Sequence, residues 1–431
     1  MAAANTPTRR ALKMASMGAN VAGSYLGYVL QTALVGKAKR EQKLKTTHAR
    51  VARRVRDEMV SLRGPAMKLG QTLSLQTGIL PEETLTELAT LQMQAPGMHP
   101  SLVRVQVKAS LGKEPEEIFE TFSPKPFAAA SLGQVHEATI RGGKRVAVKI
   151  QYPGIRKTIE SDFKWFRTIT KPAQASGHIP KEAIDEMEKQ IIAETDYKCE
   201  ADNIDFFREK LAPLSFVEVP GVYREYSADK VLTMTFVRGR HLEQFLASRP
   251  SQKVRNQLGT NLFDLYYFQL LNLGAFHADP HWGNYLFNDD CTIGLVDFGC
   301  AKKLSKAALH YLRGVYLYPG SRHSAEFRRL LETNYENQGK KLPRAAYRAL
   351  VAFAEEYRKV YPPDKDKQFV FDFNDKTFLT NYIRHATNLF RTKHVMTDYI
   401  FMARAEMGLY NTLHALKARV PTSDIVRKYL L

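Results

Sequence analysis

The spacing of apolar residues follows a helical period near the N-terminus and a strand period after residue 126. Apolar residues recur every four positions over residues 46–62, which predicts a helix with one buried face. Another helix is expected over residues 101–111, and Gly112 is expected to end it. Residues 127–149 alternate like strands, and Gly142-Gly143 is a hairpin signal between two of them. This region therefore predicts a small antiparallel sheet.

The rest of the chain has a helical pattern that one short hairpin interrupts. We expect an acidic helix over residues 180–211, a buried strand over 231–234, and an apolar helix over 256–273 that Gly274 ends. Residues 285–287 and 293–296 are short apolar runs separated by Asn288-Asp289-Asp290, which is a turn signal. Beyond Gly299 the pattern is almost wholly helical. The chain is therefore predicted to have an α+β fold.

Three polar residues flank the predicted hairpin at its open end. Asp279 and Asn284 precede the first strand and Asp297 follows the second, so all three can face one small volume. Two carboxylates and an amide suit Mg²⁺. Asp279 and Asn284 are five positions apart, as in the protein-kinase pattern H-R-D-x-x-x-x-N, and an Asp-Phe-Gly follows in the expected place. These residues predict a phosphoryl-transfer site.

Two other interpretations of this stretch remain open. One is a polar hairpin turn with a coincidental Asp-Phe-Gly. The other takes His277, Asp279 and His281 as a metal-ligand cluster, because histidine and carboxylate at short spacing can bind zinc or iron. No second cluster elsewhere in the sequence completes such a coordination shell.

The charge of the chain is concentrated near its N-terminus. The formal net charge is +19, and residues 1–56 hold 12 Lys or Arg and one acid, a net of 12 − 1 = +11. Such a segment attracts nucleic acid, anionic lipid or an acidic partner. Residues 14–36 are uncharged and flanked by basic residues, which favours a membrane-contacting helix, with anionic lipid and no nucleic acid as partner. Whether this helix spans the bilayer or lies on it stays open.

Two further features bear on assembly and compartment. Gly23 and Gly27 are four positions apart, a spacing at which two helices can approach closely, so a homodimer through this helix is one expected arrangement.

Three cysteines are too few and too scattered for a disulfide framework or a zinc motif, which fits a reducing compartment.

The region before the hairpin offers the remaining parts of a nucleotide site. The small residues Ala128, Ala129, Ala130 and Ser131 stand where a phosphate-covering loop would lie. Lys149 ends a Val-Ala-Val strand, a position that suits a cation for the α and β phosphates, and a carboxylate of the acidic helix should pair with it. Met234 and Phe236 lie where two lobes could be hinged and backbone groups could hold adenine.

Six motifs in order resemble the UbiB/AarF/ADCK family of atypical protein-kinase-like proteins. They are KLGQ at 68–71, AAASLGQVH at 128–136, VAVK at 146–149, ETDYKCEA at 194–201, HADPHWGN at 277–284 and VDFG at 296–299. The resemblance runs from about residue 10 to the C-terminal region. Two departures are His281-Trp282, where relatives tend to have Asn-Pro, and Thr235, where an acidic hinge residue is common.

The resemblance implies a bilobal protein-kinase-like fold with a small N-lobe antiparallel sheet, a helical C-lobe and an N-terminal helical extension. The expected parts are a basic segment over 1–45, the extension over 46–125, the N-lobe over 126–236 and the C-lobe over 237–431. In such proteins the extension folds over the active site, and its lysine meets a Glu-x-Asp motif. In this sequence the residues of the extension are Lys68 and Gln71, and the Glu-x-Asp motif is Glu194 and Asp196. Because that motif meets the extension, the resemblance implies Glu200 as the ion-pair partner of Lys149.

The family implies binding of ATP (or ADP) with Mg²⁺, ATPase activity, and support of ubiquinone or other isoprenoid-lipid metabolism at a membrane. Partners would be proteins of a quinone or isoprenoid-lipid pathway. Asn284 and Asp297 would hold the metal, Lys149 would neutralise the phosphates, and Asp279 would orient the nucleophile. A protein or small-molecule kinase and a non-catalytic nucleotide-sensing scaffold remain alternatives.

The expected location is the cytoplasmic face of a bacterial inner membrane, with the matrix side of the mitochondrial inner membrane as the alternative.

Ala278 stands where the usual kinase loop has an arginine, which argues against regulation by activation-loop phosphorylation.

Overall fold

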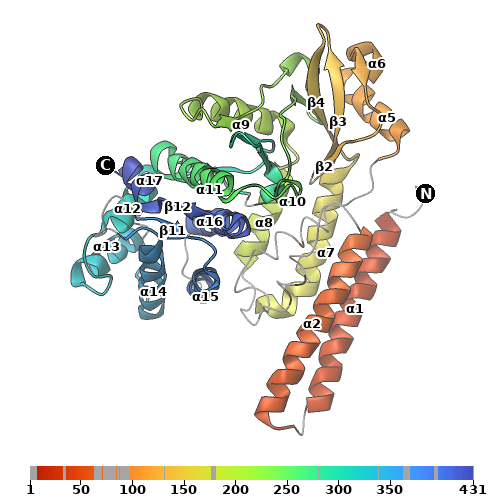
Figure 1. The fold of residues 1–431 in the computed structure, drawn as a ribbon. Coiled ribbons are helices and arrows are strands. Elements are labelled where there is room, and N and C mark those ends of the chain that lie inside the picture. Colours follow the sequence, from red (N-terminus) through yellow and green to blue (C-terminus); the bar gives the residue numbers. More distant parts are fainter. Residues whose placement is uncertain are drawn as a thin grey trace. The chain divides into compact units, whose positions relative to one another are not determined.

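The computed structural model describes residues 7–32, 35–62, 70, 84, 87, 98–130, 132–175, 181–279, 281–337, 339–362, 369–392 and 397–430. Contacts between residues divide the chain into two compact units. The first holds Met1–Cys199 and Val222–Thr235, and the second holds Glu200–Gly221 and Phe236–Leu431. Small antiparallel sheets and many helices form both units (Figure 1), which confirms the predicted α+β class.

The first unit begins with two long helices, α1 (Pro7–Thr32) and α2 (Lys37–Leu62), which pack side by side (Figure 1). Helix α2 starts nine residues before the predicted 46–62 segment. Its buried side chains Val51 and Met59 lie on the face that the four-residue spacing predicted. The uncharged stretch 14–36 falls mostly within α1. No helix in the described part of the chain is long and apolar enough to cross a membrane.

The sheet of the first unit is antiparallel throughout. Its strands follow the order β1 (Thr121–Phe122), β3 (Gly133–Ile140), β4 (Lys144–Gln151) and β6 (Val231–Thr235), and β2 (Ala128–Ala130) pairs with β3. Gly142 and Gly143 have φ of +89° and +71° and form the predicted turn between β3 and β4. One face of the sheet packs on helix α5 (Pro100–Leu111), which precedes the short α6 (Pro115–Ile118), and buries an aliphatic core that includes Val103, Val107, Val146, Val148 and Ile150.

The acidic helix predicted over residues 180–211 is wrong as a single element. After α7 (Ile155–Ala175), α8 (Lys181–Ala193) ends, and three residues separate it from α9 (Tyr197–Lys210). Thr195 donates to the carbonyl of Ile192 at 2.6 Å, and Asp196 accepts from the backbone N–H groups of Lys198 and Cys199 at 3.1 and 3.0 Å. Such side-chain bonds compete with continuous helix and start a new one. Asp196 therefore caps α9 and does not share its face with Glu200.

The predicted hairpin belongs to one small sheet of the second unit, and a second strand pair involves the residues that flank it. Strands β8 (Tyr285–Phe287) and β9 (Ile293–Leu295) form that hairpin, and β5 (Val217–Glu218) pairs in parallel with β9. Strand β7 (Ala275–His277) pairs with β10 (Ala301–Lys303). The expected apolar helix is α11 (Gln252–Tyr267), continued by a wider π-turn, η3 (Phe268–Leu273), and Gly274 ends it with φ of +62°.

Six further helices confirm the helical pattern expected beyond Gly299. They are α12 (Lys306–Leu317), α13 (Ala325–Glu336), α14 (Arg344–Val360), α15 (Lys376–Arg391), α16 (Thr397–Leu416) and α17 (Thr422–Leu430). Five of them, all except α13, share one large apolar core with α10 (Leu242–Ala247) and α11, and α13 packs in a smaller apolar cluster with α12 and α14. The strand pair β11 (Phe371–Asp372) and β12 (Arg419–Val420) was not predicted, because two-residue strands carry no alternation.

Candidate active site

The β8–β9 hairpin brings two of the predicted metal-binding residues to one end of the second unit. Tyr285 pairs with Leu295, and the backbone N–H of Val296 donates to the carbonyl of Asn284 at 3.1 Å. Asn284 ends the short helix η4 (Trp282–Asn284) directly before β8, and Asp297 follows Val296. The two residues therefore leave adjacent strands at the same end of the hairpin, as the sequence predicted.

His277 joins the two loops that carry the predicted catalytic and metal-binding residues. Its Nδ1 lies 3.1 Å from the carbonyl oxygen of Asp279, and its Nε2 lies 2.5 Å from the carbonyl oxygen of Asp297. The ring is 4% exposed and packs edge-on against Phe298. Because both ring nitrogens contact backbone oxygens, His277 is a positioning residue. This geometry speaks against its alternative role as a metal ligand.

The two carboxylates are oriented by backbone groups of their own loops. Asp279 accepts from the N–H of His281 at 3.3 Å, and Asp297 accepts from the N–H of Gly299 at 3.0 Å. Asp279 also lines a cavity of about 20 Å³ beside Tyr285, large enough for one water molecule. Burial raises the pKa of Tyr285, and the negative charge of Asp279 raises it further. Tyr285 therefore stays a neutral neighbour of the proposed base.

Helix α9 is bonded to the Asp-Phe-Gly segment within the second unit. Glu200 is 1% exposed and accepts from the N–H of Phe298 at 3.4 Å, and Asn203 donates to the carbonyl of Phe298 at 3.0 Å. The rings of Phe207 and Phe298 lie 5.5 Å apart. Sequence reasoning did not find these contacts, because it considered Glu200 only as a partner of Lys149. Lys149 belongs to the first unit, so that pairing stays a prediction.

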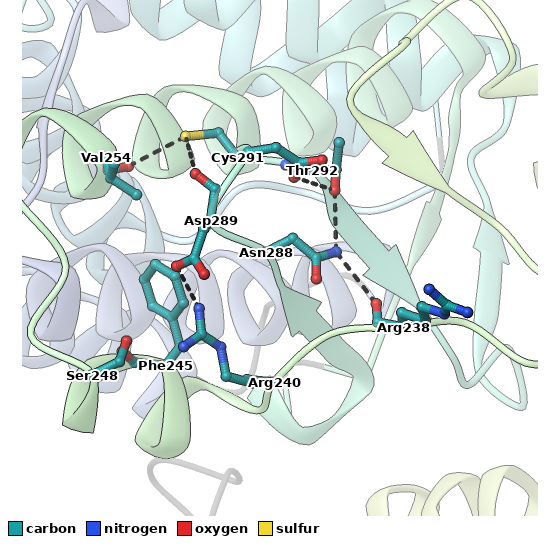
Figure 2. A network of polar contacts seen from close by, with 10 residues as sticks. Arg238, Arg240, Phe245, Ser248, Val254, Asn288, Asp289, Cys291 and Thr292 are labelled. Atoms are coloured by element: carbon teal, nitrogen blue, oxygen red, sulfur yellow. Dashed lines mark hydrogen bonds and ion pairs between the residues drawn. The ribbon is translucent and has the colours of Figure 1, made fainter.

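The turn end of the hairpin is fixed to the segment that follows Phe236. Figure 2 shows Asn288 donating to the carbonyl of Arg238 and the Arg240 guanidinium paired with Asp289. Arg240 also exchanges backbone hydrogen bonds with Phe287 at 3.1 and 2.8 Å. Gly239 has φ of +144° between them, where other residues are strained. The same hairpin is thus anchored at one end and carries Asn284 and Asp297 at the other.

The first unit places Lys149 inside its sheet. Lys149 lies on β4 opposite Val135 and Leu232, is 5% exposed, and has its Nζ 5.3 Å from the ring centroid of Tyr197. Met234 lies on β6 and is 4% exposed. Both positions follow from the β-strand pattern that the sequence showed.

The small-residue segment before β3 is mostly strand. Ala128, Ala129 and Ala130 form β2, paired with Val135, Gln134 and Gly133, so these three residues of the expected loop are strand. Ser131 lies outside the described residues. A Cβ on Gly133 would lie 2.3 Å from the carbonyl oxygen of Ile150, which requires glycine at this close backbone approach.

The residues proposed for the regulatory extension are only partly described. Glu194 lies in the turn after α8 and is 7% exposed, and Asp196 caps α9. Lys68 and Gln71 lie outside the described residues. The contact between Lys68 and the Glu-x-Asp motif therefore stays a prediction.

The open end of the hairpin fits a magnesium ion. The Nδ2 atom of Asn284 is buried and has no hydrogen-bond partner among the described residues, so the amide is not committed to a structural role. An amide oxygen with the carboxylate of Asp297 is a donor set that Mg²⁺ prefers, usually completed by water and phosphate oxygens. Within the described ranges no group of three or more His, Cys, Asp or Glu residues could hold a metal, which weighs against the zinc or iron alternative.

Known proteins match more than half of this chain. A family model described as the ABC1 atypical kinase-like domain matches residues 90–322. The chain is 34% identical to the chloroplastic protein ACTIVITY OF BC1 COMPLEX KINASE 7 of Arabidopsis thaliana, over 60% of this chain and 38% of that protein. It is 29% identical to the mitochondrial atypical kinase COQ8 of Saccharomyces cerevisiae, over 75% of this chain and 64% of that protein. The chain thus spans less than two thirds of either relative.

A solved structure shares the fold. It is an erythromycin complex from Mycobacterium tuberculosis, 24% identical, with a TM-score of 0.57 over 85% of this chain and 92% of that one. This similarity concerns the fold alone.

Proposed function

The chain belongs to the ABC1 atypical kinase-like family, and from this premise we propose that it binds ATP with Mg²⁺ and hydrolyses the nucleotide. The observation that carries the proposal is the hairpin end at which Asn284 and Asp297 meet, tied by His277 to the loop of Asp279. In this arrangement one set of backbone contacts fixes the proposed base and both proposed metal ligands.

Each residue of the site has a role that its contacts support. Asn284 and Asp297 would hold the metal, which neutralises phosphate charge when bound. Asp279, held by the N–H of His281, orients the nucleophile and accepts its proton. His277 keeps the two loops in register. For Lys149 we propose the role expected from its strand, neutralisation of the nucleotide phosphates.

We further propose that the protein works at a membrane in quinone or isoprenoid-lipid metabolism. The support is the basic α1–α2 segment and relatives that are named mitochondrial or chloroplastic. In this proposal α1 and α2 contact anionic lipid, and the substrates or partners come from the lipid pathway.

The test is ATP hydrolysis by the purified chain with Mg²⁺, with and without liposomes that contain anionic lipid. Asp297→Asn removes a proposed metal ligand and should lower the hydrolysis rate at least about a hundredfold. Asp289→Asn makes the same chemical change at the opposite end of the hairpin, and its rate should stay within about twofold of the native one. The same samples give the thermal stabilisation by ATP with Mg²⁺, which reports binding separately from hydrolysis.

Each alternative function has its own outcome. Unchanged hydrolysis and unchanged thermal stabilisation in Asp297→Asn would show that the site assignment is wrong. ATP binding without hydrolysis, even with liposomes, would favour a nucleotide-sensing scaffold. Phosphate incorporation into another protein that Asp279→Ala abolishes would favour a protein kinase.

A further inference from the structure

A second cavity lies in the helical region of the second unit, among side chains of α12, α13, α14, α15 and α16. Its volume is about 60 Å³. The walls are almost entirely aliphatic and aromatic, with Leu331, Leu350, Phe353, Ala386 and Met402 among them. Apolar cavities of this kind stay dry and take apolar guests. The lining therefore selects a hydrocarbon group.

One charged residue, Arg322, lines this cavity. Among its lining residues in the described part of the chain, Arg322 is the one that carries a formal charge. It lies in the connection between α12 and α13 and is 2% exposed, while its neighbours Ser321 and His323 are exposed. Arg322 is therefore a buried side chain in a connection whose neighbouring residues reach the surface.

The hydrogen-bonding capacity of Arg322 is only partly used. Its Nη1 donates to the carbonyl of Tyr318 at 2.8 Å, and the guanidinium lies 4.9 Å from the ring centroid of Phe327. Its Nε is buried and has no hydrogen-bond partner among the described residues. No carboxylate in that part of the chain forms an ion pair with it, and the charge of Glu355 acts on it only from a distance. A buried cation without a paired carboxylate is unfavourable, and burial lowers its pKa. An anionic group would satisfy it.

No negative charge in the wall of the cavity opposes such an anion at neutral pH. Tyr316, which lines the cavity, donates to Glu406 in the adjoining core. Burial raises the pKa of Glu406 to about 8, so this carboxyl group is mostly uncharged at pH 7. The charged group in the described lining is thus Arg322, and the charges of Glu355 and Arg358 outside the lining act on it in opposite directions.

We propose that this cavity binds an aliphatic amphiphile with a single anionic head group, the chain between the helices and the head group on Arg322. A carboxylate or a phosphate would serve, because both accept hydrogen bonds from a guanidinium. The site lies wholly within the second unit, and its ligand is bound without nucleotide. The proposal therefore stands or fails independently of the proposed ATPase.

The experiment is isothermal titration of the full chain with butyrate, butyl phosphate and butanol, because a cavity of about 60 Å³ holds only a short chain. The three probes are short aliphatic molecules that differ in the head group. Either anion should bind at least about tenfold more tightly than butanol, and the stronger of the two identifies the head group. Equal binding of all three, or no binding of the anions, would overturn the proposal.

Two variants test the two halves of the site. Arg322→Met keeps an unbranched apolar stem and removes the charge, so anion affinity should fall to that of butanol while butanol binding is unchanged. Ala386→Leu fills the cavity and should weaken all three probes. Arg329→Gln removes an exposed arginine from the neighbouring α13 and should leave all three affinities unchanged. If Arg322→Met binds the anions as tightly as the native chain, the proposal is wrong.

A variant that fails to fold would not leave the question open. The melting temperature of each variant is measured first, and the comparison of probes on the native chain needs no substitution. Native-chain binding that does not depend on the head group already excludes Arg322 as the recognition group.

Discussion

At the scale of single residues, His277 links the backbone positions of two proposed catalytic groups. We predict that His277→Leu lowers the ATP hydrolysis rate at least about tenfold, because the carbonyls of Asp279 and Asp297 lose their common contact and the loops shift. The measurement is steady-state kinetics with the melting temperature of each variant. His241→Ala, at an exposed histidine whose side chain makes no capping bond, is the matched control. A native hydrolysis rate in the folded His277→Leu protein would contradict the role.

Glu406 gives a prediction of pH-dependent stability. It is fully buried and accepts from the hydroxyl groups of Tyr267, Tyr316 and Tyr382 at 3.2, 3.3 and 3.0 Å. Its pKa rises from 4.5 to about 8 because of burial, and the tyrosine hydrogen bonds offset part of that rise. The folded chain therefore binds this proton more tightly than the unfolded chain.

The sign follows from proton linkage. The stabilising contribution is complete below about pH 4.5 and is lost as pH rises towards about 8, at up to about 1.4 kcal/mol per pH unit. Glu406→Gln removes this titration, so the difference in unfolding free energy between the two proteins should change between pH 5 and 8. Denaturant titrations at several pH values measure it. Parallel stability curves would show that Glu406 does not titrate in this range.

The sequence places the residues of the proposed site near one another, but their supporting contacts could not be predicted. Asp279, Asn284 and Asp297 lie on one short hairpin, so local spacing and turn signals bring them together. The tyrosine hydroxyl groups that donate to Glu406 belong to residues as far as 139 positions away along the chain. The periodicity of apolar residues does not indicate which residues pair at such a separation in sequence. Glu200 was predicted as a carboxylate of the site. Its hydrogen bond to the N–H of Phe298 was not predicted, because that bond depends on how α9 packs.

At the scale of elements, the cap of α9 can be tested directly. We predict that Asp196→Ala destabilises the chain by about 1 kcal/mol, because the N–H groups of Lys198 and Cys199 lose their acceptor. Asp196→Asn keeps a capping oxygen and should stay within a few tenths of a kcal/mol. Chemical denaturation of the three proteins provides the comparison. Equal losses for both variants would assign the effect to charge and not to capping.

Elements with a clear period were predictable and irregular ones were not. The β3–β4 and β8–β9 hairpins and helix α5 follow from alternation, glycine turns and Gly112. The break between α8 and α9 was missed because Thr195 and Asp196 are tolerated on a helix surface, and only their side-chain bonds reveal the interruption. Segment β2 was expected as loop, because three alanines show no alternation.

At the scale of the whole molecule, the uneven charge predicts how the chain meets a membrane. We expect binding to vesicles with anionic lipid that weakens as salt concentration rises, and no binding to neutral vesicles. Replacing Lys39, Lys43 and Lys45, exposed on α2, with glutamine should lower vesicle affinity at least tenfold, since each basic residue near the surface contributes about 1 kcal/mol.

The control for this prediction changes the same charge elsewhere. Glutamine at Lys340, Lys341 and Lys417, which are exposed in the second unit, should have a much smaller effect in vesicle sedimentation. If both triple variants lose affinity equally, the net charge of the chain and not the α1–α2 segment governs binding.

The kinase-like fold was predictable because six motifs keep their order along the chain. The cavity beside Arg322 was not, since its lining runs from Tyr311 to Ala403 and comes from five helices. Each helix shows only an apolar face, and whether facing side chains fill the space between them depends on the packing of all five.

The residue Trp282 gives the proposed active site an optical signal of its own. The chain has two tryptophans, and Trp282 lies between Asp279 and Asn284 with 40% of its surface exposed, while Trp165 is half-buried in α7. After Trp165→Phe, the indole fluorescence of the protein comes from the loop between Asp279 and Asn284 alone. Its emission wavelength and its quenching by iodide then follow that loop as nucleotide and metal are added, without any attached dye.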